Sequence, residues 1–149
     1  MLFRSDMGVE SYLIADSTVG IIAQRLVRRL CPNCKRPRAL LDHEADYLGL
    51  SAQERKAQTV CEPVGCQRCN GSGFYGRIGV YEIMEITPTL RGMIARRAHT
   101  DSLRKAAIEE GMSTLKQSAR RLVLNGTTAI SELHAISVED SDQTKQNIT

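Results

Sequence analysis

Two pairs of cysteines constrain this chain more than any other feature of its sequence. Cys31 with Cys34, and Cys66 with Cys69, each have the spacing C-x2-C, and 31 residues separate the two pairs. A C-x2-C turn lets two thiolates face one metal ion, and two such turns complete a tetrahedral shell that suits zinc and leaves no position for water. The sequence therefore predicts one structural zinc ion, held by these four thiolates.

The fifth cysteine, Cys61, fits this site less well. It would pair with Cys66 at a wider spacing and leave Cys69 spare, so its role stays open. A redox-active dithiol is the main chemical alternative to zinc. Such a site needs only one C-x2-C pair, which usually follows a strand of an α/β domain. Two pairs in one chain favour the metal.

Composition points to an ordinary globular chain with few aromatic residues. Of its 149 residues, 42% are hydrophobic, 25% are charged and only 4% are aromatic. A core built from aliphatic side chains favours helices over a β-sandwich. The net charge of +3 is small for a nucleic-acid-binding protein.

Neither a membrane span nor a signal peptide is expected. The most apolar stretch, residues 12–30, carries several charged side chains, whereas a span needs about 20 largely uncharged residues. The first residues contain no apolar core of a signal peptide. We therefore expect a cytoplasmic chain whose cysteines stay reduced.

Periodicity and capping signals divide the chain into expected elements. An apolar stripe predicts a helix over residues 8–30, which Pro32 would end so that Cys31 lies at the helix terminus. Short helices are expected at residues 44–48 and 51–56, the second opened by a capping box of Ser51 and Glu54.

The second half of the chain is expected to form one strand and then helices. Alternation predicts a strand over residues 77–86. Helices should begin at Thr87-Pro88 and at Thr100-Asp101, the latter ending at Gly111. A third helix with Leu115 should end at Asn125-Gly126, and Thr127-Thr128 should cap a fourth. The polar tail, residues 138–149, is predicted to be disordered.

These elements predict a mainly α chain with a small irregular or β zinc-binding insert, in the α+β class. The expected organisation is a helix over residues 6–30, a tetracysteine subdomain over 31–76, a strand with a helical bundle over 77–137, and the tail.

Other motifs carry less information. No G-x4-G-K-[ST] loop is present, so the chain has no phosphate-binding loop of its own. Residues 66–73 match C-x2-C-x-G-x-G, the zinc repeat of DnaJ-type co-chaperones, but the first cysteine pair lacks the glycines. Residues 17–41 contain six basic and no acidic side chains. We interpret this run as a solvated face that also compensates the thiolate charge, in preference to a nucleic-acid or phosphate contact.

Several segments together resemble one known family, the type II secretion and type IV pilus assembly ATPases. The resemblance is to the C-terminal region of these ATPases. It covers about residues 6–137 of this chain, with the matching segments in the same order. The segments that carry it are DMGVE at 6–10, QRLVRRLCPNCK at 24–35, GCQRCNGSGFYGRIGVYE at 65–82, GMSTL at 111–115 and GTT at 126–128.

The resemblance implies the C-terminal part of a RecA-like hexameric motor. In this family the Walker A loop, the Asp box, the Walker B strand and the His box precede the DMGVE segment, so we expect a truncated piece in which residues 1–5 fit no family pattern. ATP and Mg²⁺ would belong to the parent protein, and this piece alone is expected to be inactive. The implied partners are its own subunits and the inner-membrane platform and tether proteins, without nucleic acid. The implied location is cytoplasmic and peripheral to the inner membrane.

The resemblance also suggests contact residues. Some positions are similar to stretches of pilus retraction ATPases that lack the cysteines, so we interpret them as subunit or interdomain contacts and not as support for zinc. They are Gln24, Arg25, Arg28, Arg77 and Glu82.

Two functions from other classes stay open on the sequence alone. One is a free-standing zinc module that binds nucleic acid or protein, and the other is a DnaJ-like thiol or zinc co-chaperone module. Which secretion or pilus system is involved, and what it exports, is also open.

Overall fold

The computed structural model describes residues 8–136 and divides the chain into two compact units. The first unit contains residues up to 23 together with 81–114, and the second contains 24–80 together with the residues from 115 onward. Both units therefore join segments that are distant in sequence, whereas the predicted organisation followed consecutive segments. The predicted disordered tail, 138–149, and the unmatched residues 1–5 lie outside the described residues.

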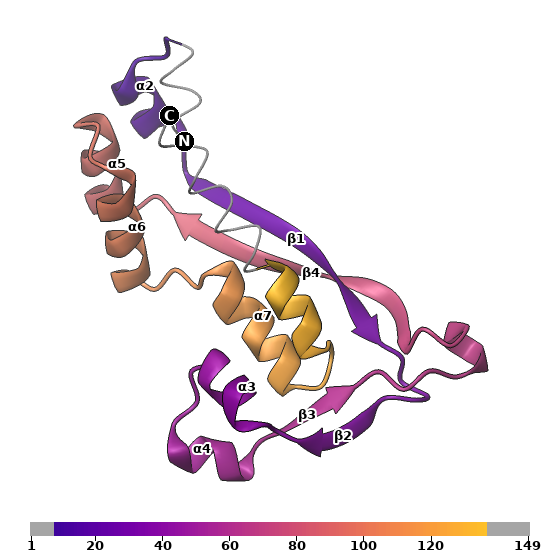
Figure 1. The fold of residues 1–149 in the computed structure, drawn as a ribbon. Helices are drawn as coiled ribbons and strands as arrows, with labels where there is room; N and C mark the ends of the chain where they lie inside the picture. The colour runs from indigo at the N-terminus through magenta and orange to yellow at the C-terminus, as the bar shows by residue number, and fades with distance from the viewer. Residues whose placement is uncertain (1–7, 137–149) are drawn as a thin grey trace. The chain divides into compact units, whose positions relative to one another are not determined.

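The first unit is a small helical core on the ends of two strands (Figure 1). It contains α2 (Ser11–Ser17), α5 (Pro88–Ala95), α6 (Thr100–Glu109) and the adjoining ends of β1 (Gly20–Leu30) and β4 (Phe74–Glu85). Its buried apolar residues include the cluster of Ile14, Ala15, Ile86 and Ile94, and also Leu90 and Ala107. As predicted, Thr87 caps α5, its hydroxyl accepting from the Leu90 amide at 3.2 Å.

The predicted helix over residues 8–30 is wrong beyond α2. Residues 20–30 form strand β1, which pairs with β4. The apolar residues of this stretch fit a helical stripe, but they also fit an alternating pattern, and several are β-branched. Pairing with β4 selected the strand over the helix. The hydrogen bond from the Ile86 amide to the Val19 carbonyl, 3.0 Å long, joins the residues next to this end of the pair. Cys31 consequently follows a strand and not a helix.

The second unit contains a second antiparallel ribbon that the sequence did not predict. Strands β2 (Arg36–Ala39) and β3 (Thr59–Glu62) pair in the register Arg36 to Glu62 and Ala39 to Thr59. Between them lie α3 (Asp42–Tyr47) and α4 (Ala52–Ala57), which confirm the two predicted short helices. The capping box is confirmed, since the Ser51 amide donates to the Glu54 carboxylate at 2.8 Å and the Ser51 hydroxyl accepts from the Glu54 amide.

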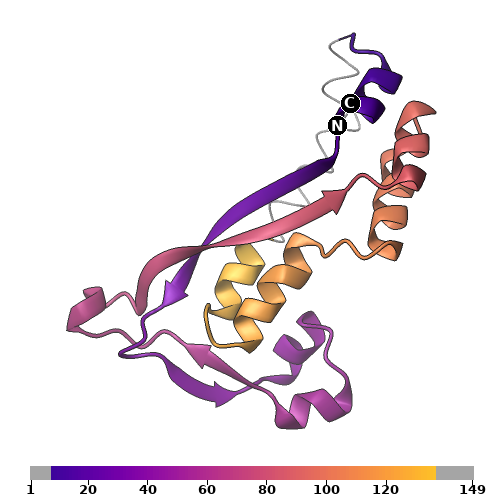
Figure 2. The ribbon, with the colours of Figure 1, turned by 180° about the vertical axis from the view of Figure 1, so that it is seen from behind.

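Two helices fill the second unit between its ribbons. Helix α7 (Leu115–Leu124) and the helix over residues 130–136 lie between the β1–β4 and β2–β3 ribbons in both views (Figures 1 and 2). Their buried side chains include Ala119, Val123 and Leu133. Gly126, at φ +63°, ends α7 as predicted. The described chain mixes helices and strands, which confirms the α+β class, and none of its helices is long and apolar enough to cross a membrane.

Candidate metal centre

Four thiols from two distant segments converge in the second unit. The Sγ atoms of Cys31, Cys34, Cys66 and Cys69 all lie within 4.8 Å of one another. Cys31 directly follows β1 and Cys34 lies in the next turn, while Cys66 precedes the 3-10 helix η1 (Gln67–Cys69) and Cys69 is its last residue. The structure therefore brings together the four residues that the sequence singled out.

The sulfur spacing fits a tetrahedral metal ion. A Zn–S bond of about 2.3 Å places the sulfurs of a regular tetrahedron about 3.8 Å apart. The observed separations are 3.9 Å for Cys31 and Cys66, 3.8 Å for Cys34 and Cys69, and 3.7 Å for Cys66 and Cys69. The cluster can thus hold one ion with all four positions of its shell filled by sulfur.

Backbone amides point at the sulfur of the second pair. Cys69 Sγ accepts from the amides of Cys66 at 3.1 Å and Gly73 at 3.3 Å. Burial raises the pKa of Cys69, but these two N–H groups lower it, and the net result is a pKa of about 6. Burial and, to a smaller extent, the neighbouring thiols raise the pKa of Cys34 to about 12, against one amide contact that lowers it. A thiolate therefore forms more readily at Cys69 than at Cys34.

Two glycines let the chain fold tightly around the cluster. At Gly65, with φ +101°, an added Cβ would lie 2.5 Å from the Gly71 carbonyl oxygen. At Gly73, with φ +75°, an added Cβ would lie 2.4 Å from Pro63 Cβ. The Gly73 carbonyl also accepts from the Cys31 amide at 2.9 Å, which ties the two cysteine segments together. The conformation of this loop thus depends on residues without side chains.

Cys61 lies outside the cluster. It is part of β3, and its sulfur would be 2.8 Å from a Cβ added at Gly126. Its place beside the turn after α7 agrees with the prediction that it is not a ligand, although its role stays a prediction.

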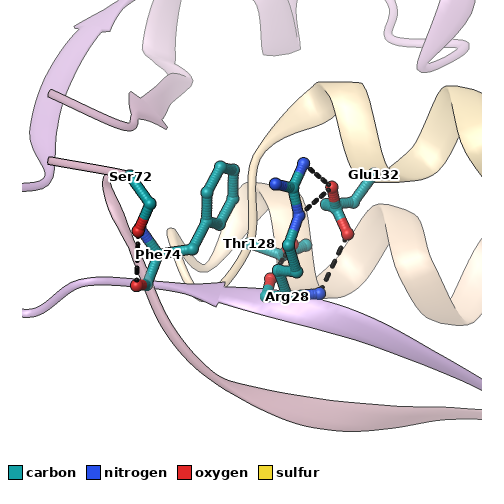
Figure 3. Close-up of polar contacts among 5 residues, drawn as sticks. All are labelled: Arg28, Ser72, Phe74, Thr128 and Glu132. Carbon is teal, nitrogen blue, oxygen red and sulfur yellow. Dashed lines mark hydrogen bonds and ion pairs between the residues drawn. The ribbon is translucent and has the colours of Figure 1, made fainter. Parts of the chain in front are cut away.

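Arg28 joins β1 to the helix over residues 130–136 (Figure 3). Its guanidinium donates to Glu132 Oε1 from Nε at 3.0 Å and from Nη2 at 2.7 Å, and its amide donates to Glu132 Oε2 at 2.9 Å. The guanidinium also lies 4.0 Å from the centre of the Phe74 ring. The buried Thr128 hydroxyl donates to the Arg28 carbonyl at 2.7 Å. Glu132 and Thr128 were not identified from the sequence, since nothing local links them to a residue about 100 positions earlier.

The other predicted contact residues lie on the paired strands. Gln24 and Arg25 are part of β1, and Arg77 and Glu82 are part of β4. Glu82 forms an ion pair with Arg104 at 3.7 Å within the first unit. The role of these residues in subunit contacts stays a prediction.

The fold and the cluster define an α+β protein with four cysteines close enough together to hold one metal ion. The family described as "Type II/IV secretion system protein" matches residues 2–135. The chain therefore belongs to this family, and the resemblance seen in the sequence is confirmed.

Curated relatives of the chain have names from type IV pilus assembly and from type II secretion. The chain is 37% identical to the type IV pilus assembly ATPase PilB of Myxococcus xanthus over 86% of its own length and 23% of the relative. It is 35% identical to the type II secretion system protein E of Dickeya dadantii, over 91% of its own length and 26% of the relative. The chain thus spans about a quarter of these relatives.

Proposed function

We propose that this chain is the zinc-bearing C-terminal part of a motor ATPase that powers type II protein secretion or type IV pilus assembly. Its role is structural, with contacts between subunits, and it carries no complete ATP site. The observation that supports this best is the tetracysteine cluster, in a chain that aligns along most of its length with a protein named a type IV pilus assembly ATPase and with a type II secretion system protein E.

The zinc ion has a structural role in this proposal. Cys31, Cys34, Cys66 and Cys69 would hold it, which ties the end of β1 to the loop before β4. That loop, residues 63–73, contributes only Cys69 to the buried apolar residues, so packing alone does little to hold it. Structural zinc contributes on the order of 10–16 kcal/mol in small metal-dependent units.

The chemistry of ATP would belong to the parent protein. Phosphoryl transfer needs a loop and a lysine around the phosphates and a hydroxyl and carboxylate for Mg²⁺. The 149 residues contain no G-x4-G-K-[ST] motif. The parent would be a homohexamer at the cytoplasmic face of the inner membrane, bound to the platform and tether proteins of its machine. The family match and the curated relatives do not support the alternatives of a nucleic-acid-binding zinc module or a co-chaperone.

A genetic experiment in the encoding cell tests the proposal. Deleting the coding sequence should abolish either surface pili or the release of exported proteins, and the defect that appears identifies the system. Restoring the gene with Cys66→Ser should fail to rescue, while Cys61→Ser, the matched cysteine outside the cluster, should rescue fully. A deletion strain with normal piliation and normal secretion would refute the motor assignment.

A further inference from the structure

A hollow of about 280 Å³ opens beside the first cysteine pair, within the second unit. Its walls come from the end of β1, both cysteine loops, the start of β4 and the turn after α7. Three cationic side chains line it, Arg29, Lys35 and Arg68, and no acidic residue does. The basic run noted in the sequence therefore contributes two of its members to one concave surface.

Three other arginines of the second unit are paired with carboxylates, whereas, among the described residues, these three cations are not. Arg28, Arg38 and Arg55 each form an ion pair with a carboxylate. Within residues 8–136, by contrast, no carboxylate lies within ion-pairing distance of the three cations that line the hollow. Arg28 and Arg29 are neighbours on a strand, where successive side chains point to opposite faces, so one reaches Glu132 and the other lines the hollow.

Two of the three cations are held in place by neutral partners. Lys35 Nζ donates to the Gly126 carbonyl at 2.8 Å. Arg68 Nη1 donates to Asn33 Oδ1 at 3.1 Å, and its guanidinium lies 4.9 Å from the centre of the Tyr75 ring. Neutral partners orient the side chains and leave their positive charge uncompensated.

We propose that this hollow binds a small phosphate-bearing anion such as pyrophosphate. Guanidinium and ammonium groups are donors only, and phosphate offers several acceptor oxygens with more than one negative charge. A single carboxylate would leave most of the charge of three cations unmatched. Thr127 adds a hydroxyl to the wall. The proposal does not depend on the motor function.

Compensation of the thiolate charge is the competing explanation for these cations. Four thiolates around one Zn²⁺ carry a net charge of −2, which nearby cations would stabilise. No cysteine lines the hollow, however, so the sulfur atoms are not part of its surface. If the cations bind an anion, removing one should weaken pyrophosphate binding. If they compensate the thiolate charge, removing one should speed the loss of zinc.

The test titrates the metal-loaded chain with pyrophosphate at low ionic strength and follows amide NMR shifts and calorimetry. We expect saturable 1:1 binding that shifts the amides of Gly126 and Thr127 and weakens with added salt. Arg29→Gln and Arg68→Gln should each weaken binding about tenfold, which corresponds to about 1.4 kcal/mol. Arg36→Gln, which removes an exposed member of the same basic run that does not line the hollow, is the matched control.

Several outcomes would overturn the proposal. Equal weakening in Arg36→Gln and Arg68→Gln would show unspecific charge attraction, and wild-type shifts away from the hollow would place the anion elsewhere. Binding to phosphatidylglycerol vesicles without binding of pyrophosphate would indicate a membrane surface. Faster zinc loss to a chelator with unchanged pyrophosphate binding in Arg29→Gln and Arg68→Gln would support charge compensation. If circular dichroism shows that a glutamine variant is unfolded, Arg68→Lys, which keeps the charge, should retain measurable affinity.

Discussion

The two units of this chain are held together by different means. The first has a small apolar core of Ile14, Ala15, Ile86 and Ile94, closed by a capped helix. The second has buried aliphatic residues around α7, but its cysteine loop, residues 63–73, depends on glycines and on thiols that converge on one point. Removal of a metal ion should therefore lower the stability of the second unit much more than that of the first. Truncation of a buried aliphatic side chain should lower the stability of whichever unit contains it.

Metal removal should produce the largest effect. Elemental analysis of the purified chain should find one zinc ion, and Cys66→Ser should lose it, with a destabilisation on the order of 10 kcal/mol for the loop that it holds. Hydrogen exchange should rise sharply in residues 61–76 and little in residues 88–109. Cys61→Ser is the control and should keep its zinc. A full zinc complement in Cys66→Ser, together with its loss in Cys61→Ser, would overturn the ligand assignment.

Truncation of a core side chain should reverse this pattern. Leu90 is 1% exposed in the first unit, so Leu90→Ala should cost about 2–5 kcal/mol of unfolding free energy in denaturant titrations. Zinc content should not change. Leu13→Ala, at a side chain that is 50% exposed in the same unit, should cost no more than about 0.5 kcal/mol. Zinc loss in Leu90→Ala would mean that the two units are not separable in stability.

Alanine substitutions at two glycines can distinguish the cost of backbone strain from the cost of crowding in the cysteine loop. One glycine lies in the loop and the other in the adjoining strand β4. Gly73 and Gly76 have nearly the same φ, +75° and +76°, but only at Gly73 would a Cβ meet another atom, Pro63 Cβ at 2.4 Å. Gly76→Ala should cost about 1–2 kcal/mol from its backbone conformation alone. Gly73→Ala should cost about 1–3 kcal/mol more and weaken zinc retention. Equal melting temperatures for the two variants would contradict the tight packing of the loop.

An ion pair away from the cysteines should contribute a smaller, pH-dependent stability. Arg38 Nη1 donates to Glu44 Oε2 at 2.7 Å, and Glu44 also accepts from the Leu41 amide. The Arg38 hydrogen bond, against the effect of burial, lowers the pKa of Glu44. The stabilisation is therefore present above the ordinary carboxyl pKa, about 4.3, and is lost as pH falls through the lowered value.

Glu44→Gln should consequently cost about 1–3 kcal/mol near pH 7, the range for a hydrogen bond to a charged group. Denaturation of both proteins between pH 7 and pH 2 measures the effect, and the wild type should lose more stability than the variant across that range. A difference between them that does not change with pH would show that the contact with Arg38 does not depend on the charge of Glu44.

The last prediction is that the isolated chain shows no measurable ATP hydrolysis. The isolated 149-residue chain should release phosphate from ATP no faster than buffer, since its lysines lie outside any glycine-rich strand-to-helix turn. A malachite-green assay on the zinc-loaded protein measures this. Activity that persists through further purification, and that a substitution within this chain abolishes, would refute the expectation.

Local signals in the sequence predicted much of the fold. Thr87 with Pro88, and Ser51 with Glu54, start helices through contacts within one turn, so neighbouring residues suffice to identify them. The strands β2 and β3 were not predicted because each has only four residues. In β2, the residues Arg36, Pro37 and Arg38 also show no apolar alternation. They form because each supplies the other with hydrogen-bond partners across an insert of two helices.

The sequence by itself determined the ligand pattern and the family. Cysteine spacing identifies four thiols, because ligand chemistry depends on residue type and on short turns. Only the tertiary structure decided that residues 20–30 are a strand, since the apolar pattern suits both periods and the partner strand begins 44 residues after β1 ends. The tertiary structure likewise paired Arg28 with Glu132 and placed Arg29 in a cationic hollow. Neighbouring residues of identical chemistry acquired different roles because a strand points them to opposite faces.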